Sequence, residues 1–150
     1  MPTIKLNIKA GHLRLTDLRT IYEGPVNLEL DPECWPAVAK SADAIQSIVD
    51  QNKTVYGINT GFGRLAQEVI PTENLKDLQK NLVLSHSTGI GPNLPDSIVR
   101  LILAMKATSL ARGFSGVRRE IIDTLLAVLN KGMYPCIPAK GSVGASGDLA

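Results

Sequence analysis

The sequence predicts a mainly α-helical domain with a small N-terminal β element, an α+β fold. Two short stretches near the N-terminus alternate polar and apolar residues with the period of a strand. Most of the chain after residue 31 instead repeats apolar residues at helical spacing. The 150 residues, 44% of them hydrophobic, are enough to bury the core of one domain. We therefore expect residues 1–150 to form a single domain.

The predicted β element lies at the N-terminus. Residues 4–8 and 26–30 show the alternation of half-buried strands and could pair as a small sheet. Between them, Thr16 is the expected N-cap of a short helix that runs through Ile21 and ends at Gly24-Pro25.

A long helix is expected after Asp31-Pro32. The aspartate side chain can accept hydrogen bonds from the free amides of a first turn, and proline loses no donor there. This helix should run to about Asp50, with Trp35 as a packing residue. Three more helices are expected, each before a glycine stop: 72–87 before Gly89, 98–111 before Gly113, and 117–130 before Gly132.

These last three helices differ in their apolar faces. Helix 98–111, opened by Pro95, has apolar residues on nearly all sides and should be buried. Helix 117–130 should be capped by Ser115. The other two helices each align apolar residues on one face: Leu75, Leu78, Leu82 and Val83 on helix 72–87, and Ile121, Leu125 and Leu129 on helix 117–130.

Composition and charge exclude several classes of partner. The 16 basic and 14 acidic residues are scattered and give a net charge of +2, so there is no electrostatic footprint for nucleic acid or an anionic membrane. No run approaches the roughly 20 apolar residues of a membrane span, and the N-terminus lacks the apolar core of a signal peptide. Cys34 and Cys136 lie far apart and are typical of reduced thiols. We expect a cytoplasmic protein with a small-molecule partner.

Residues 141–148, Gly-Ser-Val-Gly-Ala-Ser-Gly-Asp, form the most distinctive pattern in the chain. The segment lacks the Lys-Ser/Thr of a P-loop, and Asp148 stands where a GxSxG hydrolase elbow needs its second glycine. A plain glycine-rich turn before a helix stays open. So does a third chemistry, in which the Gly147 amide nitrogen attacks the Ala145 carbonyl carbon to close a five-membered ring and Ser146 then loses its hydroxyl as water.

Three motifs in order carry a family resemblance. Residues 141–150 resemble the signature of the aromatic amino acid ammonia-lyases and aminomutases, and residues 56–63, Tyr-Gly-Ile-Asn-Thr-Gly-Phe-Gly, resemble the family's tyrosine loop. Leu84-Ser85-His86 falls where the family sets substrate choice. The resemblance implies the N-terminal portion of a long-helix-bundle lyase fold. It also implies a 4-methylidene-imidazol-5-one prosthetic group, formed from the tripeptide 145–147, and no metal.

The resemblance assigns roles within the glycine-rich loop 54–66. It makes Tyr56 the catalytic base, which must work as a phenolate although an ordinary tyrosine has a pKa of about 10, so we expect nearby donors that lower this pKa. The resemblance also makes Gly61 a substrate-binding residue. Asn59 is expected there too, either beside the electrophile or shaping an Asx-turn in the loop, and the sequence favours neither.

The pair Ser85-His86 bears on the substrate. The resemblance implies L-histidine, with trans-urocanate and ammonia as products, because phenylalanine and tyrosine lyases carry Phe-Leu and His-Leu at these positions. A polar substrate ring needs hydrogen-bonding partners, since an unpaired buried polar group costs about 1 to 3 kcal/mol. His86 alone would more often be a core residue, and no second ligand supports a metal. A tyrosine or phenylalanine ammonia-lyase or aminomutase stays open.

The remaining expectations concern the surroundings of the motif. Gly144 and Asp148 should support its loop, Asp148 as the cap of a following helix. The resemblance further implies a homotetramer whose sites draw on several subunits, with more site residues beyond Ala150. The 150 residues alone should then form an incomplete site with weak activity at most, and a non-catalytic helical module stays open.

Overall fold

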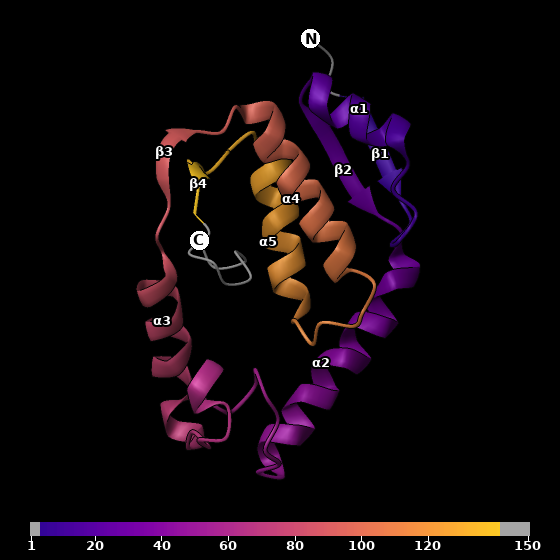
Figure 1. Ribbon diagram of the computed structural model, residues 1–150. Coiled ribbons are helices and arrows are strands. Elements are labelled where there is room, and N and C mark those ends of the chain that lie inside the picture. Colours follow the sequence, from indigo (N-terminus) through magenta and orange to yellow (C-terminus); the bar gives the residue numbers. More distant parts are fainter. Residues whose placement is uncertain (1–3, 142–150) are drawn as a thin grey trace. The chain divides into compact units, whose positions relative to one another are not determined.

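The computed structural model describes residues 4–141, which fall into two compact units. The first unit combines the chain up to residue 44 with residues 94–137, and the second combines residues 45–93 with the chain from residue 138. Most described residues are helical, and the strands near the N-terminus are short (Figure 1). The predicted fold class is confirmed. No described helix is both long and apolar enough to cross a membrane.

The first unit begins with the predicted strand pair. β1 (Ile4–Ile8) and β2 (Val26–Leu30) are paired along their whole length and run parallel. Parallel neighbours need a connection that returns the chain to the same end of the sheet, and α1 (Leu15–Glu23) lies in that connection. The alternation of side chains predicted both strands, whereas their parallel direction comes from this helical crossover.

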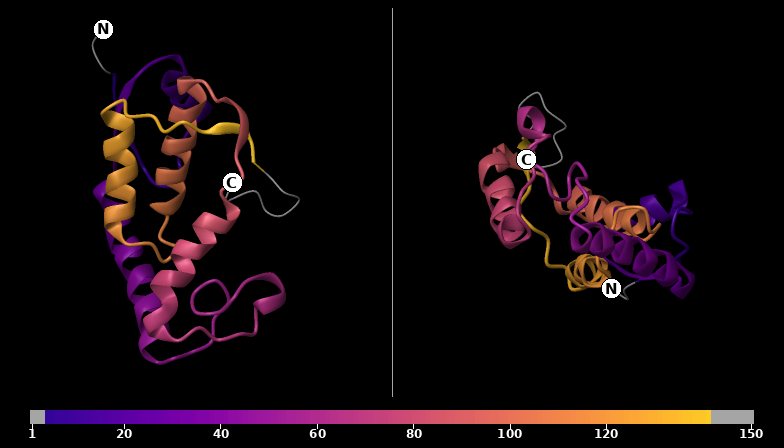
Figure 2. Two further views of the ribbon diagram at one scale, coloured as in Figure 1. Left: turned by 90° about the vertical axis from the view of Figure 1, so that its left-hand side faces the viewer. Right: turned by 90° about the horizontal axis from the view of Figure 1, so that it is seen from below.

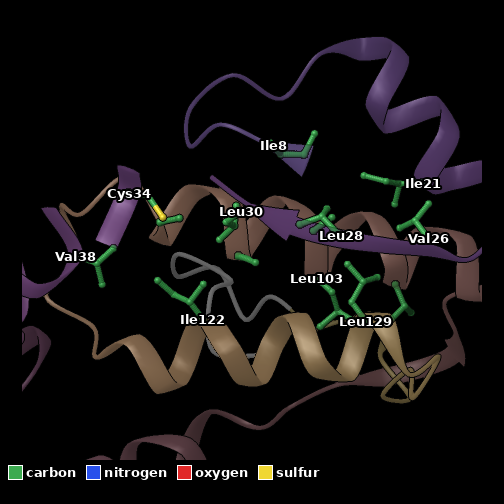
Figure 3. Close-up of a cluster of buried hydrophobic side chains, with 14 residues drawn as sticks. Ile8, Ile21, Val26, Leu28, Leu30, Cys34, Val38, Leu103, Ile122 and Leu129 are labelled. Carbon is green, nitrogen blue, oxygen red and sulfur yellow. The ribbon is translucent and has the colours of Figure 1, made fainter. Parts of the chain in front are cut away.

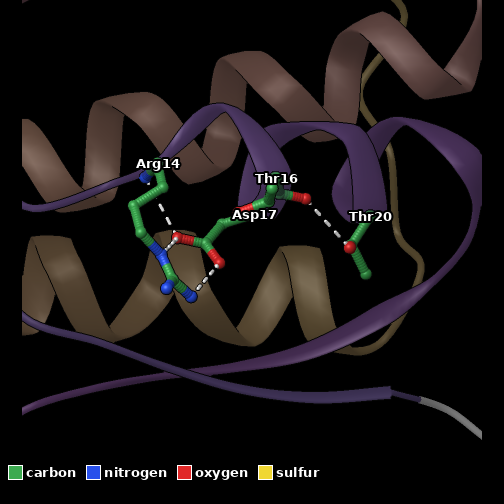
Figure 4. A network of polar contacts seen from close by, with 4 residues as sticks. All are labelled: Arg14, Thr16, Asp17 and Thr20. Atoms are coloured by element: carbon green, nitrogen blue, oxygen red, sulfur yellow. Dashed lines mark hydrogen bonds and ion pairs between the residues drawn. The ribbon is translucent and has the colours of Figure 1, made fainter.

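The start of α1 corrects one prediction, because Thr16 is not its cap. Arg14 occupies the N-cap position, and the Asp17 carboxylate accepts hydrogen bonds from the Arg14 main-chain nitrogen at 3.0 Å, Nε at 3.1 Å and Nη2 at 3.0 Å (Figure 4). The carbonyl of Thr16 accepts from Thr20 Oγ1 at 3.0 Å. Asp17 thus supplies the reciprocal half of a capping box, and the Arg14 contacts hold the pKa of its carboxyl below the usual value.

Helix α2 (Trp35–Asp50) follows the predicted start. The Asp31 carboxylate accepts from the Glu33 amide at 2.9 Å, and a short 3-10 turn precedes the α-helix. Trp35 packs against the core with the Arg119 guanidinium 4.2 Å from its ring centre, which confirms it as a packing residue. Three 3-10 turns are described: Pro32–Cys34, Gly63–Leu65 and Thr72–Asn74.

The core of the first unit lies among β2, α1, α4 (Asp96–Leu110) and α5 (Arg119–Asn130). Helices α4 and α5 pack side by side, α1 contacts α4, and α5 contacts β2 (Figure 2). Side chains from all of these elements meet in one cluster (Figure 3). The largest fully enclosed ones are Ile21, Leu28, Ile122 and Leu129.

Two polar side chains join distant elements of this unit. Asn130 Oδ1 accepts from the Leu28 amide at 2.8 Å and its Nδ2 donates to the Leu28 carbonyl at 3.0 Å, so β2 has β1 along one edge and this amide on the other. Buried Arg100 donates through Nε to the Ile21 carbonyl at 2.8 Å and through Nη2 to the Tyr22 carbonyl at 2.7 Å. A cation therefore stabilises the C-terminal end of α1.

Helix α4 is not buried on all sides as predicted. Its partners in this unit cover one face, on which Val99 and Leu103 are buried, whereas Ile102 is 38% exposed and Met105 is 51% exposed. The apolar residues around the helix therefore predicted α4 correctly, but they did not predict which of its faces this unit buries.

The start of α5 also differs from the prediction. The helix begins at Arg119 with Arg118 at the N-cap position, so Ser115 is not its cap. The Gly116 amide donates a hydrogen bond to Ser41 Oγ at 2.8 Å, which connects the loop before α5 to α2. The predicted face is wrong at its first member, because Ile122 is fully buried while Ile121 is 43% exposed, whereas Leu129 is buried as predicted.

The second unit contains α3 (Leu75–His86) and the antiparallel strands β3 (Ile90–Asn93) and β4 (Pro138–Lys140). The predicted helix is confirmed, but it ends before the predicted stop Gly89, where the Ser87 amide and hydroxyl both bond the Val83 carbonyl. The expected apolar face is covered only in part within the described residues. Its leucines are half-buried, and Val83 is 57% exposed.

Candidate active site

All predicted site residues that the structure describes lie in the second unit. Tyr56, Asn59 and Gly61 belong to the segment between α2 and α3, and Ser85 and His86 end α3. The other predicted site residues lie outside the described residues: Gly144, Ala145, Ser146, Gly147 and Asp148.

Asn59 holds the loop in shape from within. Its side chain is 5% exposed, its Nδ2 donates to the Lys53 carbonyl at 2.8 Å, and its Oδ1 accepts from the Val55 amide at 2.9 Å. The Asn59 carbonyl also accepts from the Ile70 amide at 2.9 Å. The side-chain amide therefore satisfies main-chain groups of residues that precede it in its own loop, which is not the pattern of an Asx-turn, and it keeps one donor hydrogen for another partner.

Gly61 permits a close approach of two parts of the same loop. Its amide donates to the Glu68 carbonyl at 3.0 Å, and the neighbouring residue Thr60 forms an antiparallel bridge with Val69. A Cβ atom on residue 61 would lie 2.6 Å from both the Cβ and the carbonyl oxygen of Leu65. No larger residue fits there without moving the main chain, so Gly61 serves the loop's architecture as well as any contact with a ligand.

Tyr56 is the predicted site residue of this loop that lies exposed. Its side chain is 62% exposed, and its ring meets that of Phe62 edge to face, with 5.8 Å between the ring centroids. Such aromatic pairs have preferred geometries and limit the positions of both rings. Phe62 therefore orients a tyrosine that is largely exposed.

Ser85 and His86 form one hydrogen-bonded group at the end of α3. Ser85 Oγ donates to the Asn81 carbonyl at 2.6 Å, and His86 Nδ1 lies 3.1 Å from the Leu82 carbonyl and 3.0 Å from Ser85 Oγ. A carbonyl can only accept, so these contacts favour the tautomer with the proton on Nδ1. In this tautomer, Nε2 of the half-buried ring presents a lone pair that can accept a hydrogen bond.

The chain that leads into the Ala-Ser-Gly motif runs beside the end of α3. Thr88 Oγ1 donates to the Gly141 carbonyl at 2.9 Å, and β3 pairs with β4 immediately afterwards. A Cβ atom on Gly89 would lie 2.7 Å from Cγ of Pro138, so the two segments touch there. Residues two and three positions after His86 thus contact the segment that ends where the motif begins.

The structure groups the described site residues in two clusters, the loop residues with Tyr56 and the pair Ser85-His86. Within the described part of the chain, no hydrogen bond joins one cluster to the other. Sequence reasoning did not single out Thr88, and it assigned Gly89 only as a helix stop. The signal available for both was their position directly after Ser85-His86, in a segment that is too short and polar to be a second helix.

Comparison with known proteins decides the family. Residues 13–150 match the aromatic amino acid lyase family. The chain belongs to this family. It is 52% identical over 147 residues to the histidine ammonia-lyase of Vibrio cholerae, and 50% identical over 150 residues to that of Pseudomonas fluorescens. These alignments cover 98% and 100% of the chain but 29% of each relative, so this member of the aromatic amino acid lyases spans under a third of the length of the curated relatives it matches.

Solved structures agree with this assignment. The tyrosine aminomutase of Streptomyces globisporus superposes with a TM-score of 0.87 and 32% identity, over 93% of this chain and 26% of that one. The histidine ammonia-lyase of Trypanosoma cruzi superposes with a TM-score of 0.84 and 34% identity, over 94% of this chain and 28% of that one. The fold described above is therefore the one that aromatic amino acid lyases and aminomutases share over this part of their length.

Proposed function

We propose that this chain is the N-terminal part of an ammonia-lyase that converts L-histidine into trans-urocanate and ammonia. The observation that carries the proposal is the hydrogen bond from Thr88 to Gly141, because it brings the chain entering the Ala-Ser-Gly motif next to the helix end that bears Ser85-His86. A pair suited to a polar ring and the chain that leads into a segment able to form an electrophile then lie in one unit. The histidine ammonia-lyases at about half identity support the choice of substrate.

The tripeptide Ala145-Ser146-Gly147 has the composition that ring closure requires. Its attacking nitrogen belongs to glycine, which adds no side chain to a compressed backbone, and its central serine has a hydroxyl to lose. The Gly141 carbonyl is already held four residues before Ala145. Once formed, the methylidene-imidazolone would supply an electron-poor alkene able to draw electrons from the substrate. The proposal includes no metal.

Ser85 and His86 are proposed to bind the substrate imidazole. The lone pair on His86 Nε2, in the tautomer that its Nδ1 contacts favour, can accept a hydrogen bond from a ring N–H. Ser85 Oγ lies beside the ring nitrogen of His86 and offers a second polar partner. A phenyl ring would leave these groups unpaired, which disfavours phenylalanine.

Tyr56 is proposed as the base that removes the β-proton. The residue is exposed and its ring is held by Phe62. Among the described residues its hydroxyl makes no hydrogen bond that would have to break before it faces a substrate. Asn59 and Gly61 are proposed to contribute to substrate binding chiefly by keeping the loop that presents Tyr56 in its folded form. Gly144 and Asp148 are proposed to support the motif loop.

Two further proposals concern assembly and location. The parts of the site that this chain does not carry are proposed to come from later residues and from other subunits of a homotetramer. A reducing, cytoplasmic location is proposed because both cysteines, Cys34 and Cys136, are free thiols.

The test uses the full-length enzyme and two readouts. Urocanate formation is followed by its absorbance when L-histidine is offered, and the intact mass is compared with the mass calculated from the sequence. The proposal expects urocanate, a mass lower by two water molecules, and loss of both signals in Ser146→Ala. A full-length protein that carries the two-water loss but leaves L-histidine unchanged would contradict the substrate, and one of unmodified mass would contradict the prosthetic group.

A second candidate is an aminomutase or lyase acting on tyrosine or phenylalanine. The superposition on a tyrosine aminomutase is the observation behind it, because that enzyme and a histidine ammonia-lyase share the fold of these residues. Offering L-tyrosine and L-phenylalanine to the same preparation, and analysing for both the cinnamic acids and the β-amino acids, separates these outcomes. Absence of the two-water loss together with retained assembly would instead indicate a non-catalytic helical module.

A further inference from the structure

The side chain of Thr88 contacts the segment that leads into the Ala-Ser-Gly motif. Strands β3 and β4 pair Ile90 with Lys140, and continuing this register would place Gly89 opposite Gly141. The main-chain ladder ends at Lys140, and the hydrogen bond from Thr88 Oγ1 to the Gly141 carbonyl, 2.9 Å long, adds one more connection beyond it. The hydroxyl therefore extends the sheet to the last described residue before the motif.

The close packing at Gly89 supports the same contact. Cβ on this residue would lie 2.7 Å from Cγ and 3.1 Å from Cβ of Pro138, so the missing side chain lets β4 approach the segment after α3. The Thr88 side chain can reach Gly141 because the two backbones are this close. Hydroxyl and glycine thus act together, one by bonding and the other by leaving space.

Other hydroxyls among the described residues of this unit bond within their own segment. Ser87 Oγ donates to the Val83 carbonyl at 2.6 Å and Ser85 Oγ to the Asn81 carbonyl at 2.6 Å, both along α3. The Thr88 hydroxyl instead bridges 53 positions of sequence. Its side chain links the helix end that bears Ser85-His86 to the chain entering the motif.

We propose that Thr88 is a positioning residue for ring closure, an inference that rests on the proposed function. In ring closure a bond forms between the Gly147 nitrogen and the Ala145 carbonyl carbon, and the carbonyl oxygen leaves as water with the amide hydrogens of Ser146 and Gly147. The Ser146 hydroxyl and its α-hydrogen leave as a second water. Fixing Gly141 removes backbone freedom four residues before Ala145, so less conformational entropy is lost when the tripeptide is compressed.

The test follows ring closure directly in the full-length protein. Expression is pulsed, samples are taken over time, and intact mass gives the fraction that has lost two waters in the wild type, Thr88→Val, Thr88→Ser and Thr124→Val. Valine keeps the shape of threonine without its hydroxyl, and serine keeps the hydroxyl. Thr124 is the matched control, because its hydroxyl bonds the Glu120 carbonyl of its own helix at 2.6 Å in the other unit.

Thr88→Val should close the ring about five-fold more slowly, the factor expected for the loss of one net hydrogen bond. Thr88→Ser and Thr124→Val should keep nearly the wild-type rate, with melting temperatures unchanged. If Thr88→Val does not fold, the comparison of Thr88→Ser with Thr88→Ala replaces it. A wild-type rate for the hydroxyl-free variant, or equal slowing in the serine variant, overturns the inference.

The two proposals fail in different ways. A wild-type protein that never loses two waters contradicts the proposed function, and this inference falls with it. A wild type that closes the ring but does not act on L-histidine contradicts the substrate alone, and the comparison of the Thr88 variants still decides the inference.

Discussion

At the scale of single residues, Asp17 shows how one carboxylate organises a helix start. It accepts from the main chain and from the guanidinium of Arg14, and these hydrogen bonds hold the pKa of its carboxyl below the ordinary value of about 3.9. A carboxyl with a lowered pKa stabilises the fold fully above its unfolded pKa and loses that contribution as the pH falls through its folded pKa.

Asp17→Asn should therefore lower the melting temperature at pH 7, and the difference from the wild type should shrink as the pH is taken below about 4. Thermal unfolding followed across this range measures both effects. Asp123→Asn is the matched control, since it removes an exposed ion pair with Arg119 and should change the melting temperature much less. A constant difference between Asp17→Asn and wild type at every pH would contradict the role of the charge.

Tyr56→Phe tests the proposed base. The ring and its contact with Phe62 remain while the hydroxyl is lost, so kcat for urocanate formation should fall by about 100-fold or more and the two-water mass loss should persist. Tyr22→Phe, in which an exposed tyrosine of α1 loses its hydroxyl, should leave kcat unchanged. Retained kcat in Tyr56→Phe would assign the base role to another group.

At the scale of elements, Gly89 determines how closely β4 can approach the end of α3. Gly89→Ala places a methyl group 2.7 Å from Pro138 Cγ, so β4 must move and the bond from Thr88 to Gly141 should lengthen or break. Ring closure, followed by mass in the full-length protein, should slow, and Pro138→Ala in the same chain should restore part of the rate by removing the clashing ring atoms.

Gly24→Ala is the control for this substitution, because Gly24 has nothing within 4 Å of its Cβ position. It should change neither the rate nor the melting temperature. Equal slowing in Gly24→Ala and Gly89→Ala would indicate a general effect of replacing glycine and would contradict the contact with Pro138.

The sequence predicted the helices and N-terminal strands but placed some boundaries and faces wrongly, for physical reasons. Thr16 and Ser115 have the chemistry of caps, yet Asp17 pairs with Arg14 and the loop at Gly116 is bonded to Ser41. Ile121 and Ile122 are equally apolar, so only packing decides which one faces the core. Such choices depend on contacts between residues far apart in the chain, which local pattern does not contain.

The candidate site was predicted by a different route. Motif resemblance named Tyr56, Ser85-His86 and the Ala-Ser-Gly tripeptide, because their order and spacing are distinctive. No local rule would have connected Thr88 to Gly141, since a threonine after a helix is ordinary and its partner lies 53 positions away. The main-chain partners of Asn59 likewise became visible only in the folded loop.

At the scale of the whole molecule, side-chain hydrogen bonds join elements that lie far apart in the sequence. In the first unit, Asn130 bonds both main-chain groups of Leu28, and Arg100 bonds the carbonyls of Ile21 and Tyr22. These contacts join α5 to β2 and α4 to α1, so the small sheet depends on helices that follow it by many tens of residues.

Asn130→Leu should destabilise the region around β2 by about 1 to 3 kcal/mol, because the Leu28 amide and carbonyl lose their partners. Amide hydrogen exchange of residues 26–30 measures this locally, and the Leu28 amide should exchange faster than in the wild type. Asn7→Leu, a change at an exposed position of β1, should leave the exchange of Leu28 nearly unchanged. Unaltered protection of Leu28 in Asn130→Leu would show that another group covers this edge.

The Asn130 contact has a consequence for biosynthesis. While the nascent polypeptide leaves the ribosome, β1 and β2 are available for pairing about 100 residues before Asn130 emerges, and until then one side of β2 is an open strand edge. An open strand edge can pair with strands of other chains, so the nascent chain is exposed to aggregation during this interval and chaperones could protect it.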